Sequence, residues 1–231
     1  MELKVIAYAH NGHTDKFGIP RQSRNESPIL THIVFEPEYA VREALRGIEG
    51  FSHLWLLWGF SEVEQQAWSP TVRPPRLGGN TRMGVFATRS PFRPNPIGLT
   101  SVRLLGIENG ELIVSGADLL DGTPIYDIKP YLSFSDSHPD AQNGFAEDSK
   151  NYRLQVVWLI EPESKQQAEY CSIPSVVSPK IREDIEYILS QDPRPAYQDD
   201  PTREYKLDYA GYTISFIVNG ETVIVKKVEK I

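Results

Sequence analysis

Several features that define common protein classes are missing from this chain. It has a single cysteine, Cys171, which excludes a disulfide framework and is typical of a reducing compartment. No run of 18 apolar residues occurs, so we expect no membrane-spanning helix. The first residues, MELKVIAYAHNGH, contain neither a long apolar segment nor a small-residue cleavage site. We therefore expect no export and a cytoplasmic location.

The motifs of several familiar active sites are also absent. The chain has no GxGxxG after a strand, no GxxxxGK[ST], no GxSxG and no cysteine pair, which argues against a dinucleotide fold, a P-loop, a serine hydrolase and a zinc site of the usual kind. His10 and His13 lie three residues apart without an acidic partner at ligand spacing, so we expect no metal.

Acidic residues are missing from one long window. Between Gln65 and Ile107 there is no aspartate or glutamate, and the window holds six arginines, which are Arg73, Arg76, Arg82, Arg89, Arg93 and Arg103. The window carries +6 and the remainder of the chain therefore −13, for a formal net charge of −7. Such segregation predicts a local polyanion-binding surface, with an arginine-rich loop of no special function as the alternative.

What is present predicts a mainly β protein. Short apolar runs alternate with turn residues, and Asn109-Gly110 predicts a hairpin over Ser101–Ala117. Many short strands with little helix favour a β-barrel or sandwich. The expected strands are Leu3–Ala9, His32–Phe35, His53–Phe60, Met83–Thr88, Leu99–Glu108, Glu111–Leu119 and Ile125–Pro130, with one short helix at Glu38–Arg46.

The C-terminal part has a different composition. Ser135–Lys150 is polar and rich in turn residues, which indicates a linker or exposed loop. A strand at Tyr152–Ile160 follows, and the sequence leaves open whether it belongs to the barrel. Ser178–Gln191 predicts a helix that Ser178 caps, and Tyr205–Val228 alternates around Asn219-Gly220 as a hairpin does. We expect a small α+β domain.

Three polar clusters stand out, each set by proline or glycine. They are Ile19–Gln22, Arg89–Pro96, and Asp118–Pro124 with the strand that follows it to Tyr131. Asp127 and Lys129 project on the same face of that strand. Their chemistry alone fits a purely structural ion pair as well as it fits a catalytic pair.

These clusters, with RPPRLGG at Arg73–Gly79, GVFATRSPFRPNPIGL at Gly84–Leu99, DLLDGTPIYDIKPYL at Asp118–Leu132 and DPRPAY at Asp192–Tyr197, resemble the TsaA-like, TrmO-type proteins. FGIPRQ at Phe17–Gln22 and GFSHLWLLWGF at Gly50–Phe60 extend the resemblance over essentially the full chain. It implies an S-adenosylmethionine-dependent methyltransferase with an N-terminal β-barrel, residues 1–160, and a small C-terminal α+β domain, residues 161–231. It also implies a homodimer that methylates N6 of threonylcarbamoyladenosine beside the anticodon of tRNA.

The resemblance also implies site residues. The cofactor-binding positions are Pro20, Arg21, Gln22, Ser61, Glu62, Arg89, Leu99, Asp118, Leu119, Leu120 and Asp121. Relatives often have histidine where this chain has Ser61. If that contact uses a side chain, cofactor affinity differs here, and if it uses backbone, nothing changes.

For the chemistry we expect in-line methyl transfer, with Asp127 as the base for the acceptor nitrogen and Lys129 tuning it or binding the threonyl carboxylate. The expected tRNA-binding residues are Arg76, Arg82, Arg93, Asn95, Asp192, Arg194 and Tyr197. For the last three, a helix stop with a packed tyrosine is the alternative. Two other functions stay open, a cofactor- or RNA-binding module without catalysis and a methyltransferase acting on another acceptor.

Overall fold

A computed structural model describes residues 2–20, 27–60, 68–74, 77, 80–149, 153–159, 177–194 and 200–231. The chain divides into two compact units. The first comprises residues 1–11 and 21–150, and the second comprises residues 12–20 and 151–231. In the part of the chain that is described, no helix is long and apolar enough to cross a membrane.

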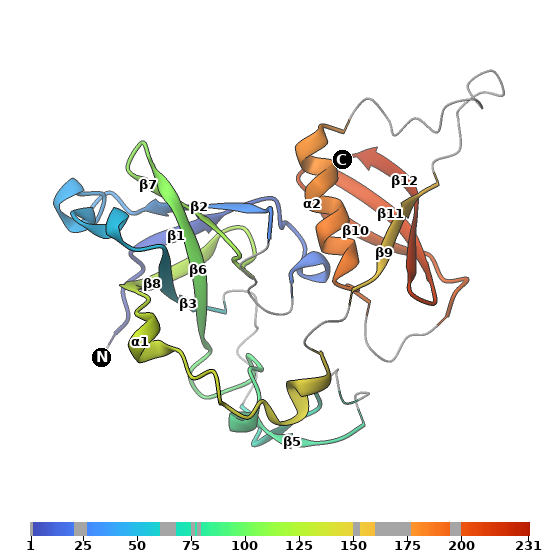
Figure 1. The fold of residues 1–231 in the computed structure, drawn as a ribbon, viewed down its shortest axis with the longest axis horizontal. Helices are drawn as coiled ribbons and strands as arrows, with labels where there is room; N and C mark the ends of the chain where they lie inside the picture. Colours follow the sequence, from blue (N-terminus) through green and yellow to red (C-terminus); the bar gives the residue numbers. More distant parts are fainter. Residues whose placement is uncertain are drawn as a thin grey trace. The chain divides into compact units, whose positions relative to one another are not determined.

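The first unit is a closed β-barrel in the order β1-β2-β7-β6-β3-β8 (Figure 1). Every neighbouring pair of its strands is antiparallel. The strands are β1 Ala7–His10, β2 Leu30–Phe35, β3 His53–Gly59, β6 Ile97–Glu108, β7 Glu111–Ser115 and β8 Thr123–Pro130. The mainly β, barrel-based fold expected from the sequence is confirmed.

Alternating side chains of these strands fill the barrel. Buried apolar residues recur at every second position, as a sheet with one face inside requires. The inward set is Ala7, Ala9, Ile33, Leu54, Leu56, Trp58, Val102, Leu112, Val114 and Ile125. The expected hairpin joins β6 to β7, where Asn109 and Gly110 have φ of 52° and 86°, the left-handed values that a type I′ turn needs.

Two expected elements of this unit are wrong. The strand at Met83–Thr88 is only β5, Met83–Gly84, which pairs with β4, Thr71–Val72; the chain then turns into η5, Val85–Ala87. The helix expected at Glu38–Arg46 is the single 3-10 turn η2, Arg42–Leu45, whose N-terminal residue provides no side-chain cap. A helix without a cap or a buried face has little to stabilise it.

Other connections of the barrel are short turns. Between β2 and β3 the chain forms η3, Ile48–Gly50. After β8 come α1, Ser133–Asp136, and η6, Gly144–Ser149, in the segment expected to be an exposed loop.

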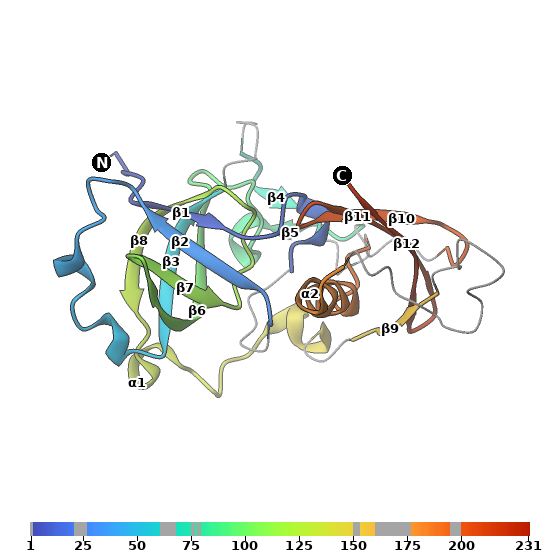
Figure 2. The same cartoon turned by 90° about the horizontal axis from the view of Figure 1, so that it is seen from above.

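The second unit is a four-stranded sheet with one helix, α2, on one of its faces (Figures 1 and 2). The sheet order is β10-β11-β12-β9, with strands β9 Gln155–Trp158, β10 Tyr205–Tyr209, β11 Tyr212–Asn219 and β12 Thr222–Lys230. The strand that the sequence left open belongs here, because β9 runs parallel to β12. α2, Pro179–Ser190, begins where expected: the Ser178 side chain accepts a hydrogen bond from the backbone N–H of Ile181.

Residues 12–20 pack in the second unit although they follow β1 directly. The backbone N–H of Ala210 donates to the Gly12 carbonyl at 2.9 Å, and η1, Lys16–Gly18, lies against β10. A Cβ at Gly18 would stand 2.3 Å from Cδ1 of Leu207, so a larger residue there would require the Leu207 side chain to shift. His13 is buried edge-on against the Tyr209 ring, with centroids 5.2 Å apart. Burial lowers the pKa of His13 to about 4.

Candidate functional site

The turn between β7 and β8, residues 116–122, contains the predicted positions Asp118–Asp121. β7 ends at Ser115, earlier than expected, because Gly116 takes a φ of 83° that a strand residue cannot hold. Thr123 closes the turn: its backbone N–H and its Oγ1 both donate to the Leu120 carbonyl, at 3.2 and 2.7 Å. The Gly122 N–H donates to the Ala9 carbonyl of β1 at 2.8 Å.

Asp118 is fixed from the barrel interior. The Thr100 hydroxyl donates to Asp118 Oδ1 at 2.7 Å and accepts from Trp58 Nε1 at 2.9 Å. Trp58 and Thr100 are both buried. Gly98, the cross-strand partner of Trp58, makes room for the indole, because a Cβ there would lie 2.1 Å from the ring. A chain of three side chains therefore connects the core to the first carboxylate of the turn.

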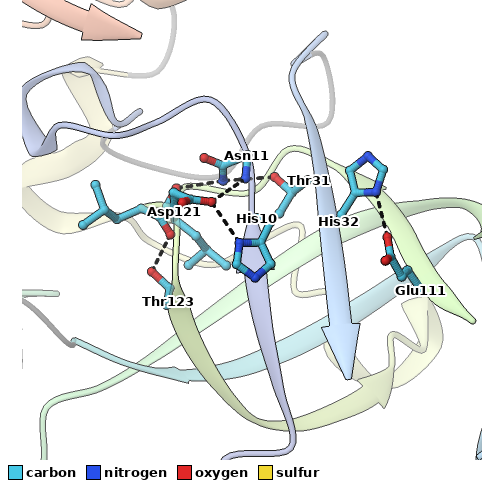
Figure 3. Close-up of polar contacts among 9 residues, drawn as sticks. His10, Asn11, Thr31, His32, Glu111, Asp121 and Thr123 are labelled. Carbon is cyan, nitrogen blue, oxygen red and sulfur yellow. Dashed lines mark hydrogen bonds and ion pairs between the residues drawn. The ribbon is translucent and has the colours of Figure 1, made fainter. Parts of the chain in front are cut away.

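Asp121 is fixed from β1 (Figure 3). Its Oδ1 accepts from the backbone N–H of Asn11 at 3.0 Å and lies 3.2 Å from Nδ1 of His10. The Asn11 side chain donates from Nδ2 to the Leu119 carbonyl at 3.1 Å and to Thr31 Oγ1 at 3.3 Å. The turn thus holds two carboxylates in a fixed arrangement, and carboxylates are acceptors suited to a cationic or hydroxyl-bearing ligand.

Asp127 and Lys129 lie further along β8, on the outer face of the barrel. Lys129 Nζ is 2.8 Å from Asp127 Oδ2, and Asp127 Oδ1 accepts from the Ile128 N–H at 2.9 Å. Both side chains are well exposed to solvent, at 61% and 44% for Lys129 and Asp127. Along an ideal strand Asp127 is about 13 Å from Thr123, so the pair and the turn are separate clusters.

Leu99 shares the outer face with Asp127. Leu57 of β3 is the cross-strand partner of both residues, so the three side chains form one row across β6, β3 and β8. Two strand spacings put Leu99 and Asp127 about 10 Å apart. The predicted cofactor residue Leu99 thus lies on the same surface as the predicted base, while its neighbour Thr100 faces inward to Asp118.

The described arginines of the window lie on the irregular segments between β4 and β6, except Arg103, which lies on β6 itself. Arg73, Arg82, Arg89 and Arg103 are exposed. Arg82 Nη1 donates to Thr71 Oγ1 at 3.0 Å, and Arg93 Nη1 donates to the Thr88 and Ser90 carbonyls at 3.1 Å each. Asn95 is exposed on the same loop. Arg93 therefore orders its own loop through these two hydrogen bonds.

The same window exposes large aromatic side chains. Phe86 is 74% exposed, Trp68 51% and Phe92 45%. Trp68 and Phe86 flank the β4–β5 ladder, because the Val85 N–H donates to the Pro70 carbonyl at 3.0 Å. Exposed aromatic rings among arginines are typical of surfaces that bind unpaired nucleotides.

In the second unit, Asp192 and Arg194 form a turn directly after α2. Arg194 Nε and Nη2 donate to the two carboxylate oxygens of Asp192 at 2.8 and 3.0 Å. Asp192 has a φ of 51°, and Arg194 is only 7% exposed. This forked ion pair holds the backbone that ends the helix.

Six predicted site residues lie outside the described residues, and these are Arg21, Gln22, Ser61, Glu62, Arg76 and Tyr197. Pro20 is buried and belongs to the second unit. No cluster of three or more histidine, cysteine, aspartate or glutamate side chains that could hold a metal occurs among the described residues.

The site also contains residues that the sequence did not assign to it. Asn11, Thr31, Thr100 and Trp58 hold the turn, and His10 contacts Asp121. Asn11 and Asp121 are 110 positions apart in the chain. Only the barrel brings them together, so no local pattern could have identified them.

Comparison with known proteins covers both units. The family described as tRNA-methyltransferase O N-terminal domain matches residues 8–137, and that described as TrmO C-terminal domain matches residues 151–231. A tRNA (adenine(37)-N6)-methyltransferase of Eikenella corrodens is 46% identical over 181 residues, 77% of this chain and 97% of the relative. The protein of the same name from Escherichia coli (strain K12) is 41% identical over 201 residues, 85% of this chain and 83% of the relative.

Solved structures agree with these matches. A crystal structure of TrmO superposes with a TM-score of 0.77 at 33% identity, covering 99% of this chain and 98% of the other. A further sequence relative is named for its cofactor. This putative S-adenosylmethionine-dependent methyltransferase, RcsF, of Pseudomonas aeruginosa is 43% identical over 204 residues, 88% of this chain and 86% of the relative.

Proposed function

The chain belongs to the TrmO family of tRNA methyltransferases, and on that premise we propose that it methylates N6 of threonylcarbamoyladenosine at the position beside the anticodon. It is an S-adenosylmethionine-dependent enzyme that acts on tRNA, as its relatives are named. The modified base as acceptor, the site residues and the assembly are our proposals.

The observation that carries the cofactor site is the acceptor-rich turn at residues 118–121. S-adenosylmethionine supplies a methyl group on a sulfonium cation. Asp118 and Asp121 are each held by hydrogen-bond donors from neighbouring strands, so their carboxylates keep their positions without a ligand. Preorganised acceptors suit a cation, because little reorganisation is needed when it binds. We propose that this turn holds the cofactor. The other residues proposed to contact the cofactor are Pro20–Gln22, Ser61–Glu62, Arg89 and Leu99.

Asp127 is proposed as the base. Methylation of the acceptor nitrogen displaces its proton, and a carboxylate within reach of that nitrogen can accept it. Asp127 Oδ2 is paired with Lys129. We propose that the threonyl carboxylate of the substrate draws Lys129 away, which leaves Oδ2 to accept the proton. The exposure of both side chains supports this, since neither is locked in the core.

The arginine window is proposed to bind the anticodon stem-loop. Arg76 and Arg82 would neutralise phosphates, while Arg93 and Asn95 would contact the modified nucleotide or its backbone. The exposed rings of Phe86 and Phe92 support an unpaired RNA loop as the partner, because unstacked bases lie on aromatic side chains.

Asp192 and Arg194, in the turn after α2, were expected to bind tRNA, and their geometry favours a supporting role instead. Arg194 is buried against Asp192 and would lose that ion pair if it reached a phosphate. We propose that the pair holds the end of α2, and that Tyr197 makes the RNA contact. A homodimer without metal, in the cytoplasm where tRNA is modified, completes the proposal.

Methyl transfer from radiolabelled S-adenosylmethionine tests the proposal. The chain is incubated with tRNA that carries or lacks the threonylcarbamoyl group. Label on the modified tRNA alone supports the proposed acceptor. Label on both, or on another RNA, would indicate a different acceptor, and cofactor binding without label would indicate a binding module.

A further inference from the structure

Asn11 donates hydrogen bonds to two different acceptors of the cofactor turn from a position outside it. Its backbone N–H bonds the Asp121 carboxylate, and its side-chain Nδ2 bonds the Leu119 carbonyl (Figure 3). Both acceptors carry negative charge or partial charge and repel each other when close. One residue that donates to both therefore fixes the distance between them.

The orientation of the Asn11 amide follows from its neighbours. The Leu119 carbonyl can only accept, so the nitrogen and not the oxygen of the amide must face it. The second amide proton is directed at Thr31 Oγ1, and Thr31 is fully buried on β2. Thr31 anchors the amide, and the amide anchors the turn.

The position of Asn11 is set by the two strands that flank β1. Asn11 directly follows β1, and β1 pairs with β2 and with β8. Ala9 is opposite Thr123, which closes the turn, and His10 is opposite His32. Two ladders thus set the direction in which Asn11 leaves the strand.

The two oxygens of Asp121 differ in their surroundings. Oδ1 is close to two donors, the Asn11 N–H and His10 Nδ1. Oδ2 has no protein donor among the residues that the structure describes, and the side chain is 39% exposed. Fixing Oδ1 also fixes the direction of Oδ2, which leaves that oxygen to accept from a ligand.

We propose that Asn11 is a positioning residue of the cofactor site, and that it presents Asp121 Oδ2 to a donor or cationic group of the cofactor. The inference rests on the proposed function, because it takes the turn as the cofactor-binding element. It assigns to Asn11 a role that is exerted through the turn and not through chemistry of its own.

The substitution Asn11→Asp in the full chain tests this role. Aspartate keeps the shape of the side chain but loses both amide protons and sets an oxygen against the Leu119 carbonyl. We expect the Kd for S-adenosylmethionine, measured by calorimetry, to rise about tenfold or more. The KM for the cofactor should rise in parallel while the KM for tRNA stays unchanged, a split that a general loss of stability would not produce.

A matched control is His32→Gln. His32 pairs with Glu111 at 3.0 Å on the neighbouring strands, and neither residue belongs to the turn. We expect it to bind the cofactor as the unsubstituted chain does. S-adenosylhomocysteine, which lacks the positive charge, identifies the group that Oδ2 faces: selective weakening of S-adenosylmethionine indicates the sulfonium, and equal weakening indicates a hydroxyl or ammonium. Both results support the proposal.

A folded Asn11→Asp protein that binds the cofactor within twofold of the unsubstituted chain overturns the inference and leaves the proposed function intact. If the unsubstituted chain does not bind the cofactor, both fail. Should Asn11→Asp not fold, Asn11→Ser carries the test by the same criterion, because a serine hydroxyl does not reach Leu119.

Discussion

The hydroxyl of Thr100 donates a hydrogen bond of 2.7 Å to the carboxylate of Asp118, 18 residues further along the chain. The same hydroxyl accepts from the buried Trp58 indole. The core of the barrel and the acceptor-rich turn are therefore connected through one oxygen atom, and a change there should affect both stability and ligand binding.

We expect Thr100→Val to weaken cofactor binding and to lower the melting temperature. Valine has the shape of threonine but removes the acceptor of Trp58 Nε1 and one hydrogen-bond donor to Asp118, a loss of about 1–3 kcal/mol in folding free energy. Thr100→Ser keeps the hydroxyl and should retain most of the cofactor affinity. Equal affinities for the valine and serine proteins would show that Asp118 needs no such support.

Asp127→Asn should lower the rate of methyl transfer under single-turnover conditions by about 10²–10⁴-fold. The asparagine carbonyl can still accept from the Ile128 N–H, so the fold should be retained. Cofactor affinity should not change, because Asp127 lies apart from the turn. A rate near that of the unsubstituted chain, with lowered stability, would assign the Asp127–Lys129 pair a structural role.

The salt dependence of tRNA binding should become weaker in Arg82→Ala. Removing one phosphate-binding side chain reduces the slope of log K against log salt by about one. Arg82 is exposed and donates to the Thr71 hydroxyl at the surface, so the substitution should leave the fold unchanged. Arg42→Ala, an exposed arginine of η2 outside the window, is the control. An unchanged slope for Arg82→Ala rules out its binding to a phosphate.

Phe86→Ala should reduce tRNA affinity by roughly 5- to 100-fold, the usual cost of removing a ring on which a base stacks. The Phe86 side chain is largely exposed, so its loss should not destabilise the barrel. Phe134→Ala provides the comparison, because Phe134 is also exposed but lies on α1. If sedimentation shows that Phe86→Ala dissociates a dimer while tRNA affinity is retained, the ring belongs to a protein interface.

Stability should fall in mild acid because of His13. Its pKa is about 4 in the folded chain and 6.5 in an unfolded one, so the unfolded chain takes up a proton first. The stability that neutral, buried His13 contributes to the fold is fully present above pH 6.5. It decreases by about 1.4 kcal/mol per pH unit down to pH 4, roughly 3 kcal/mol in all. Urea unfolding at several pH values measures it. In His13→Phe this part of the pH dependence of stability should disappear. If the loss of stability between pH 6.5 and pH 4 persists in that variant, another titrating group causes it.

The sequence predicted the elements that depend on local chemistry. The Asn109-Gly110 hairpin and the Ser178-capped helix α2 are present because turn and cap residues act on their immediate neighbours. Glu111–Leu119 was too long as a strand, since Gly116 departs from the ladder. The expected helix at Glu38–Arg46 and the strand at Met83–Thr88 had apolar spacing but no cap or no long partner strand to sustain them.

The site could be predicted only where it follows a contiguous motif. The acidic turn and the Asp127–Lys129 pair are recognisable in the sequence, and the structure confirms their ion pair. Asn11 and Thr100 act through contacts across 108 and 18 positions, which only strand order and register create. Likewise, the burial of Arg194 depends on the packing of the second unit and not on its motif.

The central claim is tested most directly by mass spectrometry of nucleosides after reaction with tRNA. The tRNA, with or without the threonylcarbamoyl group, is incubated with the chain and S-adenosylmethionine, digested, and compared with a reaction containing Asp127→Asn. We predict one added methyl group on the base of threonylcarbamoyladenosine, formed by the unsubstituted chain and only on the modified tRNA. A methyl group on another nucleoside, or none despite measured cofactor binding, would contradict the account.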